Sequence, residues 1–114
     1  MAITEAFAGT EAVAGTEWSL TTDTSGPDLE TSDGVFQVFM DLSDMVAGDQ
    51  LQIRIYEKAQ STDTQRVLYE AVLVGAQTQL VYVLPALILL HGWDITLKAL
   101  AGTITVTWSI RKVA

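Results

Sequence analysis

Apolar and polar residues alternate along residues 33–58, and this stretch carries the clearest structural signal in the chain. The apolar positions are Phe36, Val38, Met40 and Leu42 in its first half, and Leu51, Ile53 and Ile55 in its second half. Successive side chains of a strand point to opposite faces, so an alternation with a period of two residues predicts strands that bury one face. We therefore predict strands over residues 34–42 and 50–59.

The residues that follow predict a pairing partner for the second strand. A polar turn at residues 60–64 leads into a third apolar segment at residues 65–74, an order that predicts a hairpin. Centring the turn near Thr62 gives the pairs Ile55–Tyr69, Ile53–Ala71 and Leu51–Leu73 on one face and Arg54–Glu70 on the other. Apolar residues then meet apolar residues and opposite charges meet, which supports this register.

The most apolar run of the chain, residues 80–90, contains Pro85. Residues 80–84 predict a strand, and Pro85 indicates an edge, a bulge or a change of sheet, because proline has no N–H to donate to a ladder. Residues 86–90 are apolar at successive positions, which is typical of a strand in the interior of a sheet, buried on both faces or covered by another subunit.

Two segments at the C-terminal end, residues 93–100 and 103–112, predict a final hairpin across Ala101 and Gly102. The residues expected to face one another are Ile95, Leu97 and Ala99 on one strand and Ile104, Val106 and Trp108 on the other. The opposite side of the last strand carries a row of threonine and serine hydroxyls, typical of a solvated face of a sheet.

A further strand over residues 16–22, followed by a loop over residues 22–34, brings the total to about eight short strands without a convincing helix. This number of strands with turns between them predicts an all-β fold, an antiparallel β-sandwich of jelly-roll-like type. The chain of 114 residues has the length of one domain, which we expect to span residues 16–114.

Residues 1–15 are expected to form an extended N-terminal arm. They contain a six-residue repeat, TEAFAG then TEAVAG, whose glycines disfavour a helix. In an extended arm Phe7, Glu11 and Val13 share one side, because their spacings are even. Such an arm suits a position along the edge of a sheet, in the same chain or in a neighbour, although a frayed terminus is an equally open alternative.

Charge is distributed unevenly along the chain. Fourteen acidic residues face six basic residues, for a net charge of −8, and Arg54 is the first base. Phosphate backbones repel such a protein, so we expect no nucleic-acid partner. The chain has no cysteine, its first residues do not predict a signal peptide, and its longest apolar run is too short to cross a membrane as a helix.

Residues suited to catalysis or metal binding are few. A serine-histidine-aspartate site would need His91 with Asp94 and either Ser19 or Ser109, but no nucleophile-elbow motif supports it. The acids Asp41, Asp44 and Asp49 lack the alternating spacing of a calcium loop. We therefore expect no enzymatic activity, no metal and no cofactor.

Aromatic side chains give an alternative to a purely structural role. Three tryptophans and three tyrosines could line a sugar-binding face, although tryptophans of a small β domain more often build its core. We expect Trp108 in the core and Trp18, which follows the arm, to be partly exposed. The residues predicted to bind a partner are Phe7, Glu11, Val13, Trp18, Arg111 and Lys112.

Three segments together resemble a family of small proteins encoded by tailed bacteriophages. They are DGVFQVFMDLSDMVAGDQLQIRIYEK, TQRVLYEAVL and ALILLHGWDITLKALAGTITVTWSIRKV, which lie within residues 33–113. The shared features include Ala47-Gly48-Asp49, Ile55-Tyr56-Glu57-Lys58 and Leu90-His91-Gly92-Trp93-Asp94. These are sheet and turn residues, so the resemblance implies a fold and a virion context rather than a reaction.

The resemblance implies a capsid decoration (cement) protein, which is made in the bacterial cytoplasm and binds the outer capsid surface. Its expected partners are the major capsid protein and further copies of itself, without a membrane. Independently of the resemblance, the acidic arm and the basic pair Arg111 and Lys112 could attract each other between copies, which favours a closed trimer, with a dimer as the alternative. A carbohydrate-binding sandwich, a tail or fibre component and, more distantly, a small hydrolase are the alternatives.

Overall fold

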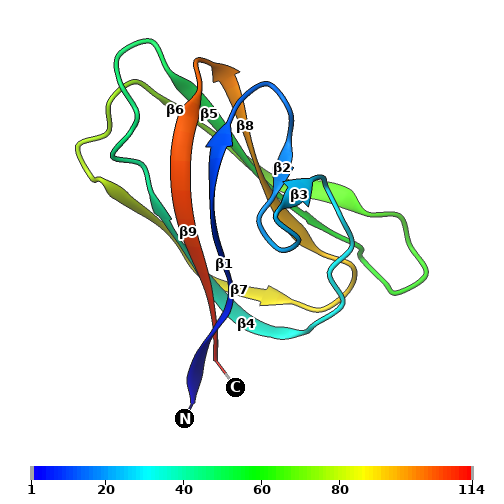
Figure 1. The fold of residues 1–114 in the computed structure, drawn as a ribbon. Helices are drawn as coiled ribbons and strands as arrows, with labels where there is room; N and C mark the ends of the chain where they lie inside the picture. The colour runs from blue at the N-terminus through cyan, green and yellow to red at the C-terminus, as the bar shows by residue number, and fades with distance from the viewer. Residues whose placement is uncertain (1, 114) are drawn as a thin grey trace.

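Two antiparallel sheets packed face to face form the molecule (Figure 1). The structure is a computed structural model that describes residues 2–113. Its strands are β1 (Ile3–Val13), β2 (Trp18–Ser19), β3 (Thr24–Ser25), β4 (Gly34–Asp41), β5 (Gln50–Glu57), β6 (Arg66–Val74), β7 (Val81–Leu89), β8 (Asp94–Ala101) and β9 (Ile104–Val113). Among the described residues there is no helix, in agreement with the predicted all-β class.

The order of the strands confirms the jelly-roll-like sandwich. One sheet has the order β1-β9-β4-β7 and the other the order β3-β2-β8-β5-β6, with every pair antiparallel. The chain crosses between the sheets after each strand, except within β2–β3 and β5–β6, which are hairpins. This nested order, with the short β3 added at one edge, is that of a jelly roll.

Alternating side chains of the two inner faces build the core. Val38, Met40, Leu51, Ile53, Ile95 and Leu97 are fully buried, as the alternation predicts. Trp93 is also buried at 0% exposure, and its ring lies 4.7 Å from that of Phe36 and 5.9 Å from that of Phe7. The prediction that Trp108 belongs to the core is confirmed, because only 2% of this residue is exposed.

The predicted register of the β5–β6 hairpin is confirmed pair by pair. The structure aligns Ile55 with Tyr69, Ile53 with Ala71, Leu51 with Leu73 and Arg54 with Glu70. The side chains of the last pair meet on the outer face, with 2.6 Å between Arg54 Nε and Glu70 Oε1. A local bulge follows, because Tyr56 pairs with Val67 and leaves Leu68 unmatched.

The predicted hairpin between residues 93–100 and 103–112 is wrong. The corresponding strands β8 and β9 lie in different sheets: β8 pairs with β2 and β5, and β9 pairs with β1 and β4. Their apolar faces therefore meet across the core rather than side by side. Alternation shows which face of a strand is buried, but two strands on opposite walls of one core share that signal with two neighbours in one sheet.

The prediction that residues 80–90 lie in the interior of a sheet is also wrong. They form β7, an edge strand that continues through Pro85, where its register with β4 shifts. Ile88 is 81% exposed and Val81 is 51% exposed. The position of Pro85 on an edge strand beside a register shift agrees with the expectation for a residue that cannot donate to a ladder.

Two short segments depart from their predicted structures. The strand expected over residues 16–22 is reduced to the two residues of β2, and the loop expected over residues 22–34 contains β3. Turns replace regular structure around these strands, with Asp23 at a positive φ of 54°. The polar residues of this segment favour such turns because their short side chains hydrogen-bond the local backbone.

Most of the predicted N-terminal arm forms β1, which pairs with β9 of the same chain from Ile3 to Val13. The two ends of the chain therefore lie close together (Figure 1). Gly9 allows this strand to lie against Trp108, because a Cβ on Gly9 would be 2.5 Å from Trp108 Cζ2. Residues 1 and 114, the outer limits of the predicted arm and sandwich, lie outside the described residues.

Candidate functional site

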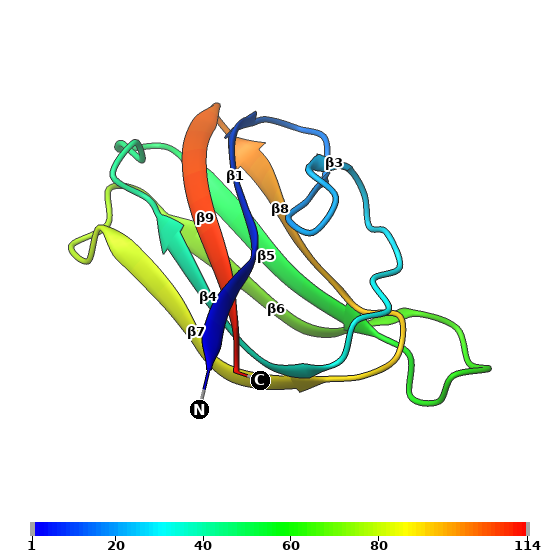
Figure 2. The same cartoon turned by 60° about the horizontal axis from the view of Figure 1, so that its bottom comes forward.

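Two edge strands, β6 and β7, expose apolar side chains on one side of the sandwich. β6 is an edge strand of one sheet and β7 an edge strand of the other, and the two strands do not pair with each other. β7 lies on the far side of the molecule from β3 (Figure 2). We define the β6–β7 surface as the exposed apolar residues of these strands and their ends: Val67, Leu68, Tyr69, Val72, Val74, Leu80, Val81, Val83, Ile88 and Leu90. Their exposures range from 38% for Val83 to 81% for Ile88. The surface extends around the edge of the sandwich, with Val72 and Val74 on the outer face of one sheet and Val81 and Ile88 on the outer face of the other.

A groove of about 350 Å³ runs between the two strands. Its lining consists of Ile55, Leu68, Tyr69, Tyr82, Val83, Leu84, Pro85, Ala86 and Leu87. The core residues Ile55 and Leu84 are 1% and 4% exposed, so the groove reaches the hydrophobic core. Only the two phenols bring polar side-chain atoms to it. Burial raises the pKa of Tyr82, and a hydrogen bond to Tyr69 adds to the increase.

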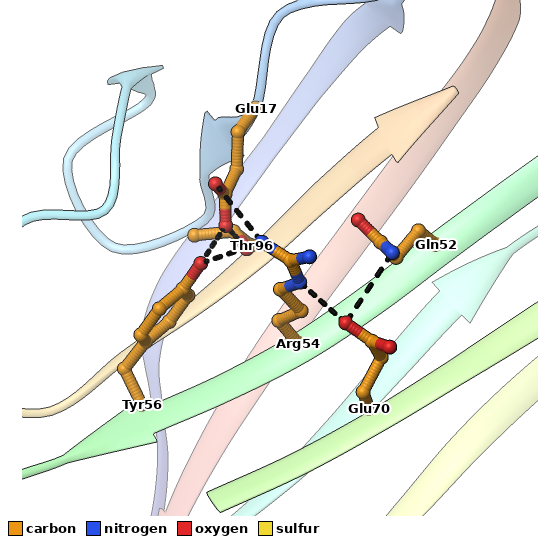
Figure 3. A network of polar contacts seen from close by, with 6 residues as sticks. All are labelled: Glu17, Gln52, Arg54, Tyr56, Glu70 and Thr96. Atoms are coloured by element: carbon orange, nitrogen blue, oxygen red, sulfur yellow. Dashed lines mark hydrogen bonds and ion pairs between the residues drawn. The ribbon is translucent and has the colours of Figure 1, made fainter. Parts of the chain in front are cut away.

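The β6–β7 surface has almost no charge, in contrast with the rest of the molecule. Residues 66–90 contain one base, Arg66, and one acid, Glu70, whereas the whole chain has a net charge of −8. Glu70 itself is paired with Arg54 on the outer face (Figure 3). An apolar, locally neutral surface is suited to a partner that excludes water rather than to a strongly basic one.

A network of polar side chains covers part of the outer face of the β3-β2-β8-β5-β6 sheet (Figure 3). Glu17, just before β2, accepts hydrogen bonds from the hydroxyls of Tyr56 and Thr96, and its Oε1 lies 3.9 Å from Arg54 Nη1. Gln52 Nε2 donates to Glu70 Oε1 at 3.3 Å, the oxygen that also accepts from Arg54. These side chains serve as hydrogen-bond donors and acceptors for one another. The network therefore connects the start of β2 with β5, β8 and β6.

Titration properties of the network follow from its contacts. Burial raises the pKa of the Tyr56 phenol, and its hydrogen bond to Glu17 adds to that effect. Hydrogen bonds to Tyr56 and Glu70 raise the pKa of Arg54 further above its ordinary value. Tyr56 therefore remains protonated and Arg54 charged near neutral pH. Both groups stabilise the sheet face rather than present a reactive atom.

Asp94 is buried between β8 and the loop that follows β2. Its carboxylate accepts hydrogen bonds from the Thr21 hydroxyl at 2.9 Å and from the backbone N–H groups of Asp28 and Ile95, each at 2.8 Å. Burial raises the pKa of Asp94, although these hydrogen bonds oppose the increase. The carboxylate thus fixes the course of residues 21–28 across the end of the sheet.

The arrangement considered for a serine nucleophile is not assembled. Asp94 uses its oxygens to hold the loop, and among residues 2–113 no hydrogen bond joins it to the His91 ring. Ser109 lies in the other sheet, where its hydroxyl donates to Glu5 at 2.6 Å. The described residues also contain no group of three or more histidine, aspartate or glutamate side chains that could hold a metal ion.

The six predicted partner-binding residues do not form one surface. Val13 is buried in the core, and Phe7 packs against Trp93. Glu11 is half-buried on β1, and Lys112 is half-buried with its Nζ 5.8 Å from the centre of the Phe36 ring.

Trp18 is partly exposed, as expected, and its Nε1 donates to Asp23 at 3.0 Å. Arg111 is exposed, with its guanidinium 3.8 Å above the Phe39 ring. The ladder places Arg111 opposite Glu5 of the same chain. The arm and the C-terminal strand thus already contact each other within one molecule.

The β6–β7 surface contains none of these six residues, so it was not predicted as a partner-binding site. One signal in the sequence could have found it, namely the run from Leu80 to Leu90, which is apolar at successive positions. Covering by another subunit was one of two explanations for that run. The exposure of β7 removes the other explanation, burial within the sheet of one chain.

Comparisons with known proteins give no further assignment. No protein-family model matches the chain, and no curated protein matches it either. Within residues 2–113, no helix is long and apolar enough to cross a membrane.

Proposed function

We propose that this protein is a structural component of a tailed-phage virion, a decoration protein that binds the outer capsid surface and stabilises the shell. The observation that carries the proposal is the β6–β7 surface, an exposed apolar area on an otherwise acidic protein. Groups of exposed apolar residues mark interaction sites. The resemblance of residues 33–113 to small phage proteins supplies the virion context.

The distribution of charge supports a position on the exterior of a shell. Most acids precede Arg54, and β1 and the loops around β2 carry many of them. A surface of this kind faces solvent readily and is repelled by the phosphates of packaged DNA. The apolar area at β6 and β7 is then the part available for contact with neighbouring proteins.

Repeated weak contacts are sufficient for this function. A decoration protein holds many equivalent positions on a lattice, so modest affinities at each contact sum to a strong overall hold. Rigid presentation of the contact surface helps, because little conformational entropy is lost on binding. The jelly roll provides that rigidity, since the core residues of β4, β5 and β8 are fully buried.

A carbohydrate-binding role has less support. That alternative depended on exposed tryptophans, but Trp93 and Trp108 are 0% and 2% exposed. Trp18 is partly exposed, and its indole N–H is engaged by Asp23. One isolated, partly covered indole does not make the aromatic platform on which a sugar ring stacks.

Purified virions of the phage that encodes the chain provide the test. Quantitative mass spectrometry should find this protein in a fixed copy number relative to the major capsid protein, and cryo-imaging should place it outside the shell. Virions produced without the gene should have capsid shells that disrupt at a lower temperature than those of the wild-type phage. Absence of the protein from intact particles, or its presence only in the tail, would overturn the decoration role.

A further inference from the structure

We infer that a second copy of this chain covers the β6 edge of the β6–β7 surface, with β6 of one copy pairing antiparallel to β6 of the other. This inference deepens the proposed function by naming a partner and a surface, and it rests on that function only for its role in the shell. Four features of the described residues support it: the exposed apolar residues of β6, the state of the edges, the charge and the symmetry of the contact.

Exposed apolar residues are concentrated on β6. Five of its nine residues are apolar and 42% to 64% exposed, namely Val67, Leu68, Tyr69, Val72 and Val74. Leu68 and Tyr69 line the groove toward β7, whereas Val72 and Val74 lie beside Gln52 and Gln50 on the outer face of the sheet. A strand that pairs with β6 would contact side chains on both of these faces.

Among the four edge strands, β6 is the one most open to strand addition. It has nine residues and contains no proline, glycine or lysine, and its protective features are two charged residues, Arg66 and Glu70, and the bulge at Leu68. By contrast, β7 contains Pro85, β1 contains Gly9 and two glutamates, and β3 has only two residues. The backbone groups of β6 that point away from β5 are available to a second strand.

The charge of the surface favours another copy over a charged partner. Two molecules with a net charge of −8 repel each other wherever their acidic faces meet. Residues 66–90 contribute one base and one acid, and β7 carries no charge. The β6–β7 surface thus brings only one acid of each described chain to the contact, Glu70, and that carboxylate is paired with Arg54 of its own copy. A basic partner would find little there to bind.

Antiparallel pairing of β6 with itself follows a two-fold axis, so both copies use the same residues and the assembly closes as a dimer. The two β3-β2-β8-β5-β6 sheets would then continue into each other across the contact. Val72 and Val74, which are 44% and 64% exposed, would be covered in both copies. The groove between β6 and β7 lies beside the contact and would lose its access to water.

Light scattering coupled to size-exclusion chromatography of the full chain tests the inference. The wild-type protein should have twice the chain mass of 12.3 kDa. Val74→Asp and, as a second variant, Val72→Asp should each have a mass of 12.3 kDa with an unchanged circular dichroism spectrum. Ile3→Asp is the matched control, because Ile3 is 66% exposed and lies on the opposite edge strand β1, and it should remain a dimer.

Two results would overturn the inference. One is a monomeric wild-type protein at a concentration on the order of 100 μM, well above the Kd of a micromolar complex. The other is a dimer that persists in both valine variants. A monomer that is nevertheless found on virions would overturn the self-association alone, whereas a dimer that is absent from virions would overturn only the proposed decoration role.

Discussion

The two sides of the sandwich, where the edge strands of the sheets lie, differ in how far other parts of the chain cover them. On one side, β1 and the β2–β3 hairpin are followed by a long loop that is tied to the sheets by specific hydrogen bonds. On the other side, β6 and β7 end in exposed apolar residues with a groove between them. We call these the closed side and the open side. They belong to one core but have opposite relationships with solvent.

Buried polar groups define the closed side. Trp93 Nε1 donates to the Ser32 carbonyl at 2.6 Å, and Trp108 Nε1 donates to the Leu20 carbonyl at 3.0 Å. The Asp94 carboxylate fixes the loop that follows β2 by accepting hydrogen bonds from the Thr21 hydroxyl and the Asp28 N–H. Each of these groups has a partner within the chain, and the buried Ser32 Oγ is the exception among the described residues.

On the open side, the hydrogen bond between Tyr69 and Tyr82 connects the two edge strands. Tyr69 and Tyr82 contribute the polar side chains of its groove, and the surrounding surface consists of aliphatic residues. A region that one chain leaves apolar and exposed, while completing the opposite region, indicates where other molecules bind. The following variants test this contrast, beginning with the largest expected effect.

Of the variants considered, Trp93→Ala, on the closed side, should reduce the free energy of unfolding most. The ring is fully buried and contacts Phe7 and Phe36, so its removal leaves a large cavity and an unpaired Ser32 carbonyl. We expect a loss of about 3–5 kcal/mol in the free energy of unfolding, measured by urea denaturation. Tyr69→Ala, in the open groove, should cost about 1 kcal/mol or less for the monomer. Equal losses for the two variants would contradict the contrast.

Asp94→Asn should be the next largest in effect. Oδ1 accepts from Thr21 and Ile95 and Oδ2 accepts from Asp28, so an amide, which keeps one oxygen, puts N–H donors against the donors on one of the two sides. We expect a loss of about 1–3 kcal/mol near neutral pH. The exposed Asp41→Asn is the matched control and should change stability little, because Asp41 bonds only its own turn at Ser43.

The pH dependence of the Asp94 effect follows from its pKa. Burial raises this pKa above the ordinary value of 3.8, so the folded protein holds the proton more tightly than the unfolded chain. The resulting stabilisation is complete below pH 3.8 and disappears as the pH rises through the raised pKa. Wild-type stability relative to Asp94→Asn should therefore increase as the pH falls through this window. A difference that stays constant with pH would argue against the buried carboxylate.

Gly9→Ala tests how tightly β1 lies on the closed side. The added Cβ would be 2.5 Å from Trp108 Cζ2, so either the strand or the indole must move. Overpacking of this kind costs about 1–3 kcal/mol. Gly15→Ala is the matched control, because a Cβ there meets no atom within 4 Å, and it should be neutral in thermal denaturation. Similar melting temperatures for the two variants would show that β1 packs more loosely.

The smallest effect is expected for the Arg54–Glu70 pair on the outer face. The two side chains are 31% and 45% exposed, and exposed ion pairs contribute below about 1 kcal/mol. A double-mutant cycle with Arg54→Ala and Glu70→Ala should give a coupling of this size that decreases in high salt. A coupling above about 2 kcal/mol would mean that the network stabilises the open edge more than its exposure suggests.

Local alternation was sufficient to predict the strands and the sandwich, and in the β5–β6 hairpin also the register. There the two strands follow each other directly in the chain, joined by residues 58–65, and a shift of one residue would have put Arg54 among the core residues. The same alternation could not assign β8 and β9 to different sheets, since Leu97 and Val106 bury the same kind of face in either arrangement. Strand order depends on crossovers between sheets, which leave no periodic signal.

The candidate surface was harder to predict for a related reason. An apolar run such as Leu80–Leu90 has the same composition whether its own sheet or another molecule covers it. The repeat predicted Phe7 and Val13 as partner-binding residues, but Val13 is buried in the core and Phe7 packs against it. Exposure can be judged only after the sheets are placed, so the open side emerges from the fold and not from any motif.

Hydrogen–deuterium exchange at two protein concentrations, one above and one below the dissociation constant of the dimer, tests the role of the open side most directly. Amides of β6, residues 66–74, should exchange more slowly at the higher concentration, because pairing with a second copy protects them. Amides of β1, which pair with β9 inside the chain, should exchange equally at both concentrations. Exchange from β6 that does not depend on concentration would contradict the assignment of the open side as the interface between copies.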